Sequence, residues 1–253
     1  MLPLDKIIDH PKIMQKVRNM IKELYGIIFM TGPTGSGKTT TLYSSLGEIN
    51  DPGTNISTAE DPIECDLEGV IQIQTHKDIG LDFARILRAF LRQDPDVILI
   101  GETRDRETAK IAVEAALTGH LVFTTLHTND APGAFTRLEE MGIEGFMMAS
   151  STIGILAQRL ARRICKNCKE EYTPEATIAK FFGFEDENNL PTFYKGAGCD
   201  KYGGSGYKGR LGVYEVMVMN EELRRLVAGG AKAVEIRECA ERHGMVSLKK
   251  YAT

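Results

Sequence analysis

The segment from Gly26 to Thr40, with the sequence GIIFMTGPTGSGKTT, constrains the fold of this chain more than any other segment. Within it, residues 32–39 match the pattern G-x-x-x-x-G-K-[ST] of a phosphate-binding loop. An apolar run of strand length, Ile27–Met30, precedes the loop, and a segment with helical character follows it until Asn50–Gly53 ends the helix. A strand, this loop and a helix in that order predict an α/β fold rather than an accidental glycine-rich turn.

The residue types of the loop suit phosphate binding. Its glycines tolerate the positive φ angles of a tight loop, and the backbone N–H groups at the start of the helix then face an anion. We expect Lys38 to reach the β- and γ-phosphates of ATP and the Thr39 hydroxyl to hold Mg²⁺. The expected nucleotide-binding residues are Gly32, Pro33, Thr34, Gly35, Ser36, Gly37, Lys38, Thr39 and Thr40.

Three further apolar runs each end in polar or charged side chains. In a parallel sheet the carboxyl ends of the strands meet at one edge, where open α/β sheets bind ligands. A single carboxylate or histidine at such a position is commonly a solvated turn residue, but the recurrence predicts one shared site. The runs with their polar ends are 56–59 with Glu60, Asp61 and Glu64, 97–100 with Glu102, and 121–125 with His127.

The remaining elements are predicted from periodicity and capping residues. The first is a helix over 9–24, with Asp9 as its N-cap, Pro11 in its first turn and Leu24 among its apolar residues. From 130 to 163 the pattern is helical and then irregular. The others are a strand over 70–74, helices over 81–92 and 105–117, a strand over 211–218 and helices over 221–253.

Two clusters on the expected helices have both a structural and a functional explanation. Arg85, Arg88 and Arg92 share one helix face, which is either solvated or turned toward phosphate or a neighbouring subunit. Cys239 and His243 are four residues apart and could be metal ligands, although a plain helix face is the ordinary explanation.

Three cysteines mark a polar segment after residue 163. Cys165 and Cys168 have the Cys-x₂-Cys spacing of half a zinc site, and Cys199 follows 31 residues after Cys168. A second Cys-x₂-Cys is incomplete because position 202 is Tyr202. Three thiolates are therefore the candidate Zn²⁺ ligands, and Asp200, water or a remote residue remains open as the fourth.

Composition excludes several classes of protein. The 253 residues are 42% hydrophobic and 26% charged, which is typical of a soluble globular protein. A net charge of −4 gives no overall attraction to nucleic acid, so no nucleic-acid partner is expected. No apolar run approaches the ~20 residues of a membrane span. Five cysteines, an odd number, do not suggest a secreted disulfide framework, so we expect a cytoplasmic protein.

Taken in order, these motifs resemble the ATPase family that powers type II secretion and type IV pilus assembly, over about residues 26–250. The loop resembles the family's Walker A motif, and its acidic box, atypical Walker B and histidine box follow in sequence. The matching segments are GPTGSGKTTTLY (32–43), AEDPIE (59–64), DPDVILIGETRD (94–105), GHLVFTTLHTND (119–130), and, for the cysteine-bearing appendage, AQRLARRICKNC (157–168) and GYKGRLGVYEV (206–216).

The resemblance implies a RecA-like P-loop fold and a cytoplasmic homo-hexamer with ATP at its subunit interfaces. Such a motor acts peripherally at the inner membrane, through a membrane platform protein. By motif position, Glu64 is the general base, Glu102 supports Mg²⁺ and water, and Lys38 and His127 complete the catalytic set. The resemblance places further residues around the nucleotide, namely Glu60, Asp61, His120, Arg104 and Arg159.

The resemblance also implies a division into four parts. These are a linker and N-terminal helix (1–25), a RecA-like ATPase core (26–163), a zinc-type appendage (164–210) and a truncated C-terminal strand with helices (211–253). The family's N-terminal domain, which supplies arginines in trans, is absent, so the chain resembles an excised motor domain. The alternative is a DNA-transfer ATPase of a conjugation-type secretion system, which the acidic charge and the cysteines oppose.

Overall fold

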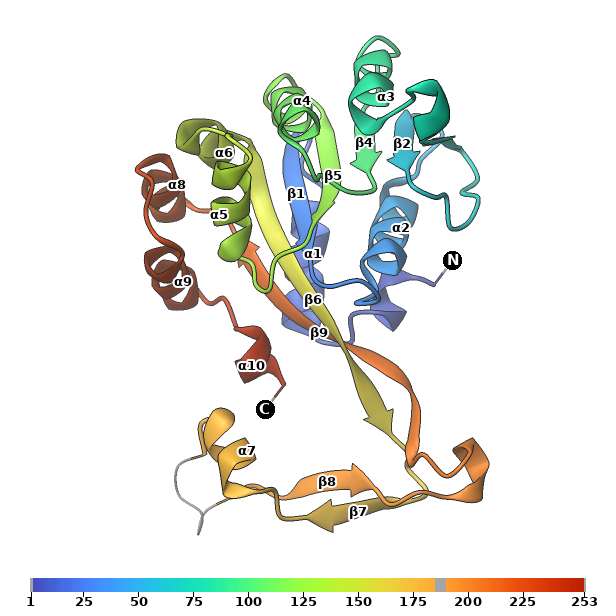
Figure 1. The fold of residues 1–253 in the computed structure, drawn as a ribbon, viewed down its shortest axis with the longest axis vertical. Coiled ribbons are helices and arrows are strands. Elements are labelled where there is room, and N and C mark those ends of the chain that lie inside the picture. Colours follow the sequence, from blue (N-terminus) through green and yellow to red (C-terminus); the bar gives the residue numbers. More distant parts are fainter. Residues whose placement is uncertain (1, 185–189, 253) are drawn as a thin grey trace.

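A seven-stranded sheet organises the computed structural model, which describes residues 2–184 and 190–252 (Figure 1). Six strands are parallel in the order β3-β2-β4-β5-β1-β6, and β9 pairs antiparallel with β6 at the edge. The predicted α/β fold with a mainly parallel sheet is confirmed. The strands are β1 Gly26–Thr31, β2 Ile56–Glu60, β3 Val70–Gln74, β4 Val97–Ile100, β5 Leu121–Leu126, β6 Thr152–Ile164 and β9 Tyr207–Val218.

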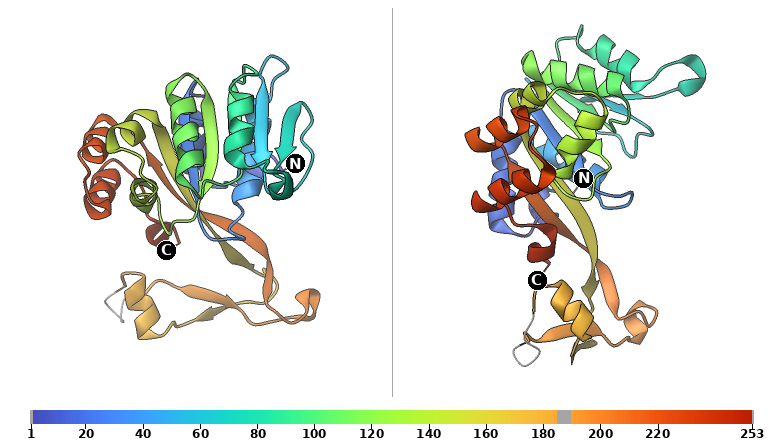
Figure 2. Two further views of the ribbon diagram at one scale, coloured as in Figure 1. Left: turned by 45° about the horizontal axis from the view of Figure 1, so that its top comes forward. Right: turned by 60° about the vertical axis from the view of Figure 1, so that its left-hand side comes forward.

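Helices cover both faces of this sheet (Figure 2). Side chains alternate along a strand, and in β1 Ile27 and Phe29 belong to one buried core while Ile28 and Met30 belong to the other. The first core also contains α3 Phe83–Phe90, α4 Arg106–Leu117, α5 Gly133–Glu140, α6 Gly145–Ser151, α8 Glu221–Ala228 and α9 Ala233–Arg242. The second contains η1 Leu4–Lys6, α1 Pro11–Met20 and α2 Lys38–Ile49.

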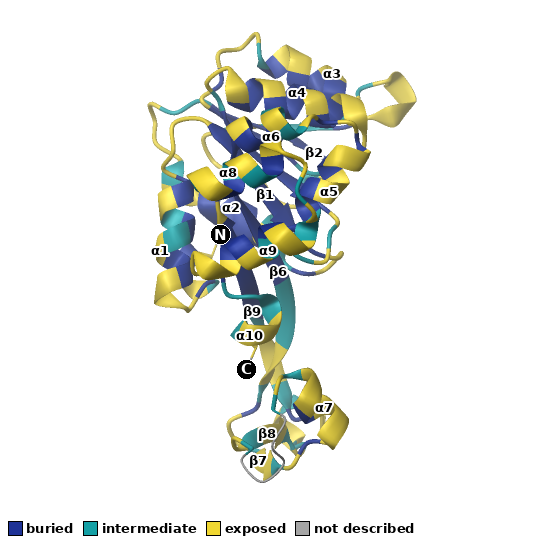
Figure 3. Ribbon diagram, turned by 90° about the vertical axis from the view of Figure 1, so that its left-hand side faces the viewer, coloured by how far each residue is buried: buried dark blue, intermediate teal, exposed yellow. Residues whose placement is uncertain are grey.

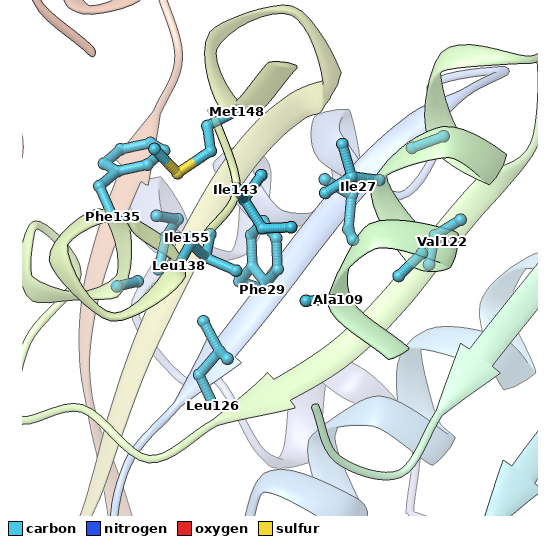
Figure 4. Close-up of a cluster of buried hydrophobic side chains, with 14 of the residues drawn as sticks. Ile27, Phe29, Ala109, Val122, Leu126, Phe135, Leu138, Ile143, Met148 and Ile155 are labelled. Carbon is cyan, nitrogen blue, oxygen red and sulfur yellow. The ribbon is translucent and has the colours of Figure 1, made fainter. Parts of the chain in front are cut away.

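The larger core joins three strands to the helices above them (Figure 4). Phe29, Val122 and Ile155 of β1, β5 and β6 meet Ala109 of α4 and Leu138 of α5, and all five are at most 1% exposed. Burying a side chain of the size of leucine or phenylalanine contributes about 1.5–3 kcal/mol to folding. This core fixes the relative positions of the strands, and so of the loops at their ends.

A small appendage hangs from the far end of the long β6–β9 ribbon (Figure 1). It contains a two-stranded antiparallel sheet and two short helices, and most of its residues are exposed or half-buried (Figure 3). Its elements are β7 Lys169–Tyr172, α7 Ala176–Phe181, β8 Phe193–Gly196 and η4 Asp200–Tyr202. The chain then returns along β9 to the core and ends in α8, α9 and α10 Leu248–Tyr251.

Two expected elements are wrong in detail. The segment expected to be irregular before residue 163 is the 13-residue strand β6, and β9 begins at Tyr207, four residues earlier than expected. Periodicity failed for β6 because its first half is buried on both faces and its second half is exposed, so neither half alternates.

The N-terminal helix is shorter than expected. It begins at Pro11, with His10 rather than Asp9 at the N-cap position, and it ends at Met20. Leu24 lies beyond this end and is 85% exposed, so it contributes nothing to the core. By contrast, Asp105 caps α4 as predicted, accepting the N–H of Thr108 at 2.8 Å. No helix in the described ranges combines the length and the apolar character needed to cross a bilayer.

Candidate functional site

A cavity of about 790 Å³ lies at the carboxyl ends of β1, β2, β4 and β5. This volume is within the roughly 300–1,000 Å³ of typical small-ligand sites. The predicted convergence of the strand ends is therefore confirmed. The predicted site residues that line the cavity are Thr34, Gly35, Ser36, Gly37, Lys38, Thr39, Thr40, Glu60, Asp61, Glu64, Glu102, Arg104 and His127.

The loop between β1 and α2 has the conformation that its glycines were expected to allow. Gly37 has φ +87° at the N-cap of α2, and a Cβ there would lie 2.9 Å from the Nε2 of Gln158. At Gly32, which opens the loop before Pro33, a Cβ would lie 2.5 Å from the Gln158 carbonyl oxygen. No side chain caps α2, so its first N–H groups remain available to an anion.

Lys38 folds back over this loop. Its Nζ donates to the carbonyl oxygens of Gly32 at 2.8 Å and Pro33 at 3.0 Å. Burial lowers the pKa of Lys38, the nearby Arg159 lowers it further, and Glu102 opposes both effects. The ammonium group is therefore held over the loop, where the phosphates of a nucleotide would lie.

Glu102 follows β4 and lies beside Arg104 and His127. Its side chain is 14% exposed, less than either of theirs. Its Oε2 lies 2.6 Å from Arg104 Nη2 and 3.7 Å from His127 Nε2. The histidine distance is longer than a hydrogen bond, so this contact is an ion pair only when His127 is protonated. A carboxylate that lines the same cavity as Thr39 provides the oxygen donors that suit Mg²⁺.

Glu60 is a buried carboxylate whose oxygens already have partners. It accepts hydrogen bonds from the Tyr43 hydroxyl, from Thr58 Oγ1 at 2.6 Å and from Gln72 Nε2 at 3.0 Å. The Tyr43 oxygen in turn accepts the backbone N–H of Glu64 at 3.3 Å. Burial and the bond to Glu60 raise the pKa of Tyr43. Glu60 therefore anchors the acidic segment, whereas the Glu64 side chain is exposed at the cavity.

Four of the predicted nucleotide-site residues do not line the cavity, namely Gly32, Pro33, His120 and Arg159. His120 precedes β5, so the six residues of that strand, about 20 Å, separate it from the His127 end. Its Nδ1 lies 3.0 Å from the Ala115 carbonyl oxygen, so His120 contacts the end of α4 and its role at the site stays a prediction. Arg159 lies beside the loop, where its Nη2 donates to the Asn129 carbonyl oxygen at 2.8 Å.

Several polar residues that line the cavity were not predicted from the sequence, among them Tyr43, Gln158, Arg163 and Arg210. Gln158 is 1% exposed, and its Oε1 accepts the Thr41 hydroxyl at 2.9 Å. Arg163 and Arg210 come from β6 and β9, the two strands whose pairing was not predicted. Tyr43 could have been suspected, because its place in the first turns of α2 faces the acidic segment.

The cysteines at 165, 168 and 199 converge, as their spacing suggested. Their sulfur atoms all lie within 4.8 Å of one another, and those of Cys165 and Cys199 are 3.9 Å apart. Tetrahedral Zn–S bonds of ~2.3 Å place two sulfurs ~3.8 Å apart, so this separation fits a shared zinc ion. A backbone N–H from Asn167 lowers the pKa of Cys165, whereas burial raises that of Cys168.

The other two candidate clusters have simpler explanations. Cys239 and His243 do lie together with Glu222, but that carboxylate already pairs with Arg242 at 2.6 Å and His243 at 2.8 Å. In the arginine stripe, Arg88 pairs with Glu107 of α4. None of the three stripe arginines lines the described cavity.

Known proteins are similar to this chain in sequence and in fold. A family model described as type II/IV secretion system protein matches residues 1–252. The type IV pilus assembly ATPase PilB of Thermus thermophilus is 50% identical over 241 residues, which are 95% of this chain and 27% of that protein. The type II secretion system ATPase E of Vibrio cholerae is 50% identical over 220 residues, 86% of this chain and 44% of that protein.

A solved structure extends the similarity to the fold. The crystal structure of the pilus retraction motor PilT with bound ADP matches with a TM-score of 0.64 and 28% identity, covering 99% of this chain and 66% of that chain. The chain spans less than half the length of the two curated relatives. Because the family model matches almost the whole sequence, the chain belongs to the type II/IV secretion system protein family.

Proposed function

We propose that this chain binds Mg-ATP in the 790 Å³ cavity and hydrolyses it, as the motor domain of a machine for pilus assembly or type II secretion. The observation that carries the proposal is the convergence of the phosphate-binding loop with Glu64, Glu102 and His127 around one cavity. The names of the relatives at 50% identity support the same activity.

The role of each residue follows from its place. Lys38 and the N–H groups of residues 35–39 bind the β- and γ-phosphates, and the Thr39 hydroxyl and Glu102 hold Mg²⁺. Bound Mg²⁺ supplies positive charge that neutralises the transferring phosphoryl group. Glu64 lines the cavity with an exposed carboxylate that has no described salt bridge, and it accepts the proton of the attacking water.

Several neighbours support these groups. His127 lies beside Glu102. From this position it orients the Glu102 carboxylate and the attacking water. Asp61 forms an ion pair with Lys77 at 3.1 Å, and Arg104 forms one with Glu102. Asp61 and Arg104 therefore contribute charge near the phosphates from positions that these ion pairs fix. Arg159 acts indirectly, by supporting the segment after His127.

Mg²⁺-dependent release of phosphate from ATP tests the activity. The proposal expects turnover that is lost without Mg²⁺ and is not stimulated by DNA. No phosphate release, with no nucleotide binding, would contradict it. DNA-stimulated turnover would favour a DNA-transfer ATPase instead.

The zinc and the assembly belong to the same proposal. Cys165, Cys168 and Cys199 hold one Zn²⁺ that fixes the end of the appendage, with the fourth position taken by water or Asp200. The motor works as a cytoplasmic homo-hexamer, peripheral to the inner membrane through a platform protein. Deleting the gene distinguishes the two machines, because loss of pili indicates pilus assembly and loss of an exported protein indicates type II secretion.

A further inference from the structure

Glu215 of β9 is a buried carboxylate that joins two segments far apart in the sequence. It is 1% exposed, and its Oε1 accepts the backbone N–H of Ala131 at 2.7 Å while its Oε2 accepts that of Leu248 at 3.1 Å. Arg237 of α9 lies 3.8 Å from Oε2 and also pairs with Asp130 at 2.8 Å. A buried charge is costly, so a site that retains one with this many partners has a use for its geometry.

The first of these partners lies in the segment that carries His127. This segment, residues 127–131, is attached to the core from four different elements. The backbone N–H of Thr128 donates to Thr31 Oγ1 at 2.8 Å, directly before the phosphate-binding loop. The other three attachments are Arg159 of β6 to Asn129, Arg237 of α9 to Asp130, and Glu215 of β9 to Ala131.

The second partner lies at the start of the last helix. The Leu248 N–H belongs to the first turn of α10, which packs beside β9 (Figure 1). In the same helix, Lys249 Nζ lies 5.0 Å from the centroid of the Phe181 ring in α7 of the appendage. One carboxylate therefore holds both the His127 segment and the helix that touches the appendage.

We propose that Glu215 is a positioning residue for His127, which it holds against Glu102 by tying residues 127–131 to the C-terminal helices. It does not touch the nucleotide cavity and acts only through the segment that it holds. The proposal rests on the function proposed above, in which His127 and Glu102 act in ATP hydrolysis. Under this proposal α9 and α10 help to position His127, although neither helix contributes a residue to the cavity.

The Glu215→Gln variant tests this because each carboxylate oxygen accepts a different N–H, and a carboxamide has only one acceptor oxygen. The variant keeps the size of the side chain but has one acceptor oxygen, and its NH₂ group must face one of the two N–H groups. The matched control is Glu222→Gln on α8. It also removes a glutamate side-chain carboxylate from the C-terminal part of the chain, but Glu222 has no described contact with residues 127–131.

The first measurement, hydrogen exchange of the full chain without nucleotide, needs no turnover. Glu215→Gln is expected to speed exchange in residues 127–131 and at the start of α10, while β1 stays protected and Glu222→Gln changes neither segment. Unchanged exchange in residues 127–131 of a folded Glu215→Gln protein overturns the proposal. This result does not depend on whether the parent chain hydrolyses ATP. A parent chain without ATPase activity would count against the proposed function alone.

The second measurement separates positioning from general stability. Glu215→Gln is expected to lower kcat roughly 10- to 100-fold, the scale of a displaced catalytic group, while KM for ATP stays the same because Lys38 is untouched. In a His127→Ala background the same change should cost nothing further. Equal losses in both backgrounds show that Glu215 does not act through His127, and they overturn the proposal.

A milder variant covers the case in which Glu215→Gln does not fold. Arg237 is 32% exposed, and Arg237→Gln removes the pair with Asp130 while the Glu215 carboxylate remains. It should lower kcat in the same direction, without further loss in the His127→Ala background, and Arg237→Lys should restore part of the activity. If Arg237→Gln lowers kcat no more than Glu222→Gln does, the positioning role is overturned.

Discussion

Tyr43 of α2 donates its hydroxyl to the buried carboxylate of Glu60, the last residue of β2. The same oxygen accepts the backbone N–H of Glu64, the proposed general base. A single side chain therefore connects the helix that follows the phosphate-binding loop to the acidic segment. The two parts of the site keep their relative positions through a contact that lies outside both motifs.

Tyr43→Phe should weaken both the fold and the reaction. It leaves the buried Glu60 carboxylate with one donor fewer, at an expected cost of about 1–3 kcal/mol in the free energy of unfolding. It also frees the Glu64 N–H, so kcat should fall with little change in KM. Urea unfolding and steady-state kinetics measure the two effects. Tyr25→Phe, at an exposed residue outside the cavity, serves as the control, and equal behaviour of the two variants would contradict this role.

Lys38→Ala should lose nucleotide affinity. The lysine is the mobile cation over the loop, and hydrogen bonds to charged groups are worth about 1.5–3 kcal/mol, or roughly 10- to 100-fold in Kd. Titration with a fluorescent ATP analogue measures this. Lys22→Ala, which removes an exposed lysine outside the cavity, should bind as the parent does. Unchanged affinity of Lys38→Ala would refute the phosphate-loop assignment.

Glu102→Gln and Glu64→Gln should keep ATP bound and stop its hydrolysis. Each retains size but loses charge and basicity, and removal of general-base catalysis costs roughly 10²–10⁴ in rate. Single-turnover assays with prebound ATP measure the chemical step directly. Glu68→Gln, at an exposed glutamate beyond the cavity, should hydrolyse normally. Wild-type rates in either catalytic variant would remove that residue from the mechanism.

One zinc ion per chain is expected in protein purified without chelator. Replacing Cys165, Cys168 or Cys199 with serine should abolish zinc binding, which elemental analysis measures. Cys65→Ser, at an exposed cysteine outside this cluster, should leave the zinc content unchanged. Tyr202→Cys should tighten binding in competition with a chelator, because it completes the second Cys-x₂-Cys. Zinc retained by all three serine variants would place the metal elsewhere.

The free energy of unfolding should depend on pH through the titration of Glu215. Burial raises its pKa, which the N–H groups of Ala131 and Leu248 and the charge of Arg237 only partly offset. A raised folded-state pKa means that the unfolded chain releases its proton first as the pH rises. The stability contributed by Glu215 is therefore complete below the ordinary glutamate pKa and falls as the pH rises through the raised value.

Urea unfolding at a series of pH values measures this contribution. The difference in free energy of unfolding between the parent and Glu215→Gln should shift toward the variant as the pH rises through that window. Glu222→Gln should show the opposite slope, because hydrogen bonds from His243 and Arg242 lower the pKa of Glu222. For that residue, stability is present above the unfolded pKa and is lost as the pH falls. Parallel slopes for the two variants would contradict the raised pKa of Glu215.

Much of the site could be predicted because it depends on chain order and one topological rule. The loop at 32–39, the carboxylates after β2 and β4 and the histidine after β5 each follow a short apolar strand. Parallel strands place their carboxyl ends on one edge, so no tertiary detail was needed to bring Lys38, Glu64, Glu102 and His127 together. The same rule places His120, which precedes its strand, away from the cavity, so only the motif resemblance connects it to the site.

By itself, the sequence determined the α/β sheet, the phosphate-binding loop and the group of polar strand ends, because each is encoded by residues that are neighbours in the chain. Only the tertiary structure decided that β6 and β9 pair, that Gln158 closes on Gly32 and Gly37, and that Glu215 joins Ala131 to Leu248. These contacts join residues far apart in the sequence, and their partners are selected by burial and packing in the folded sheet, which local periodicity does not record.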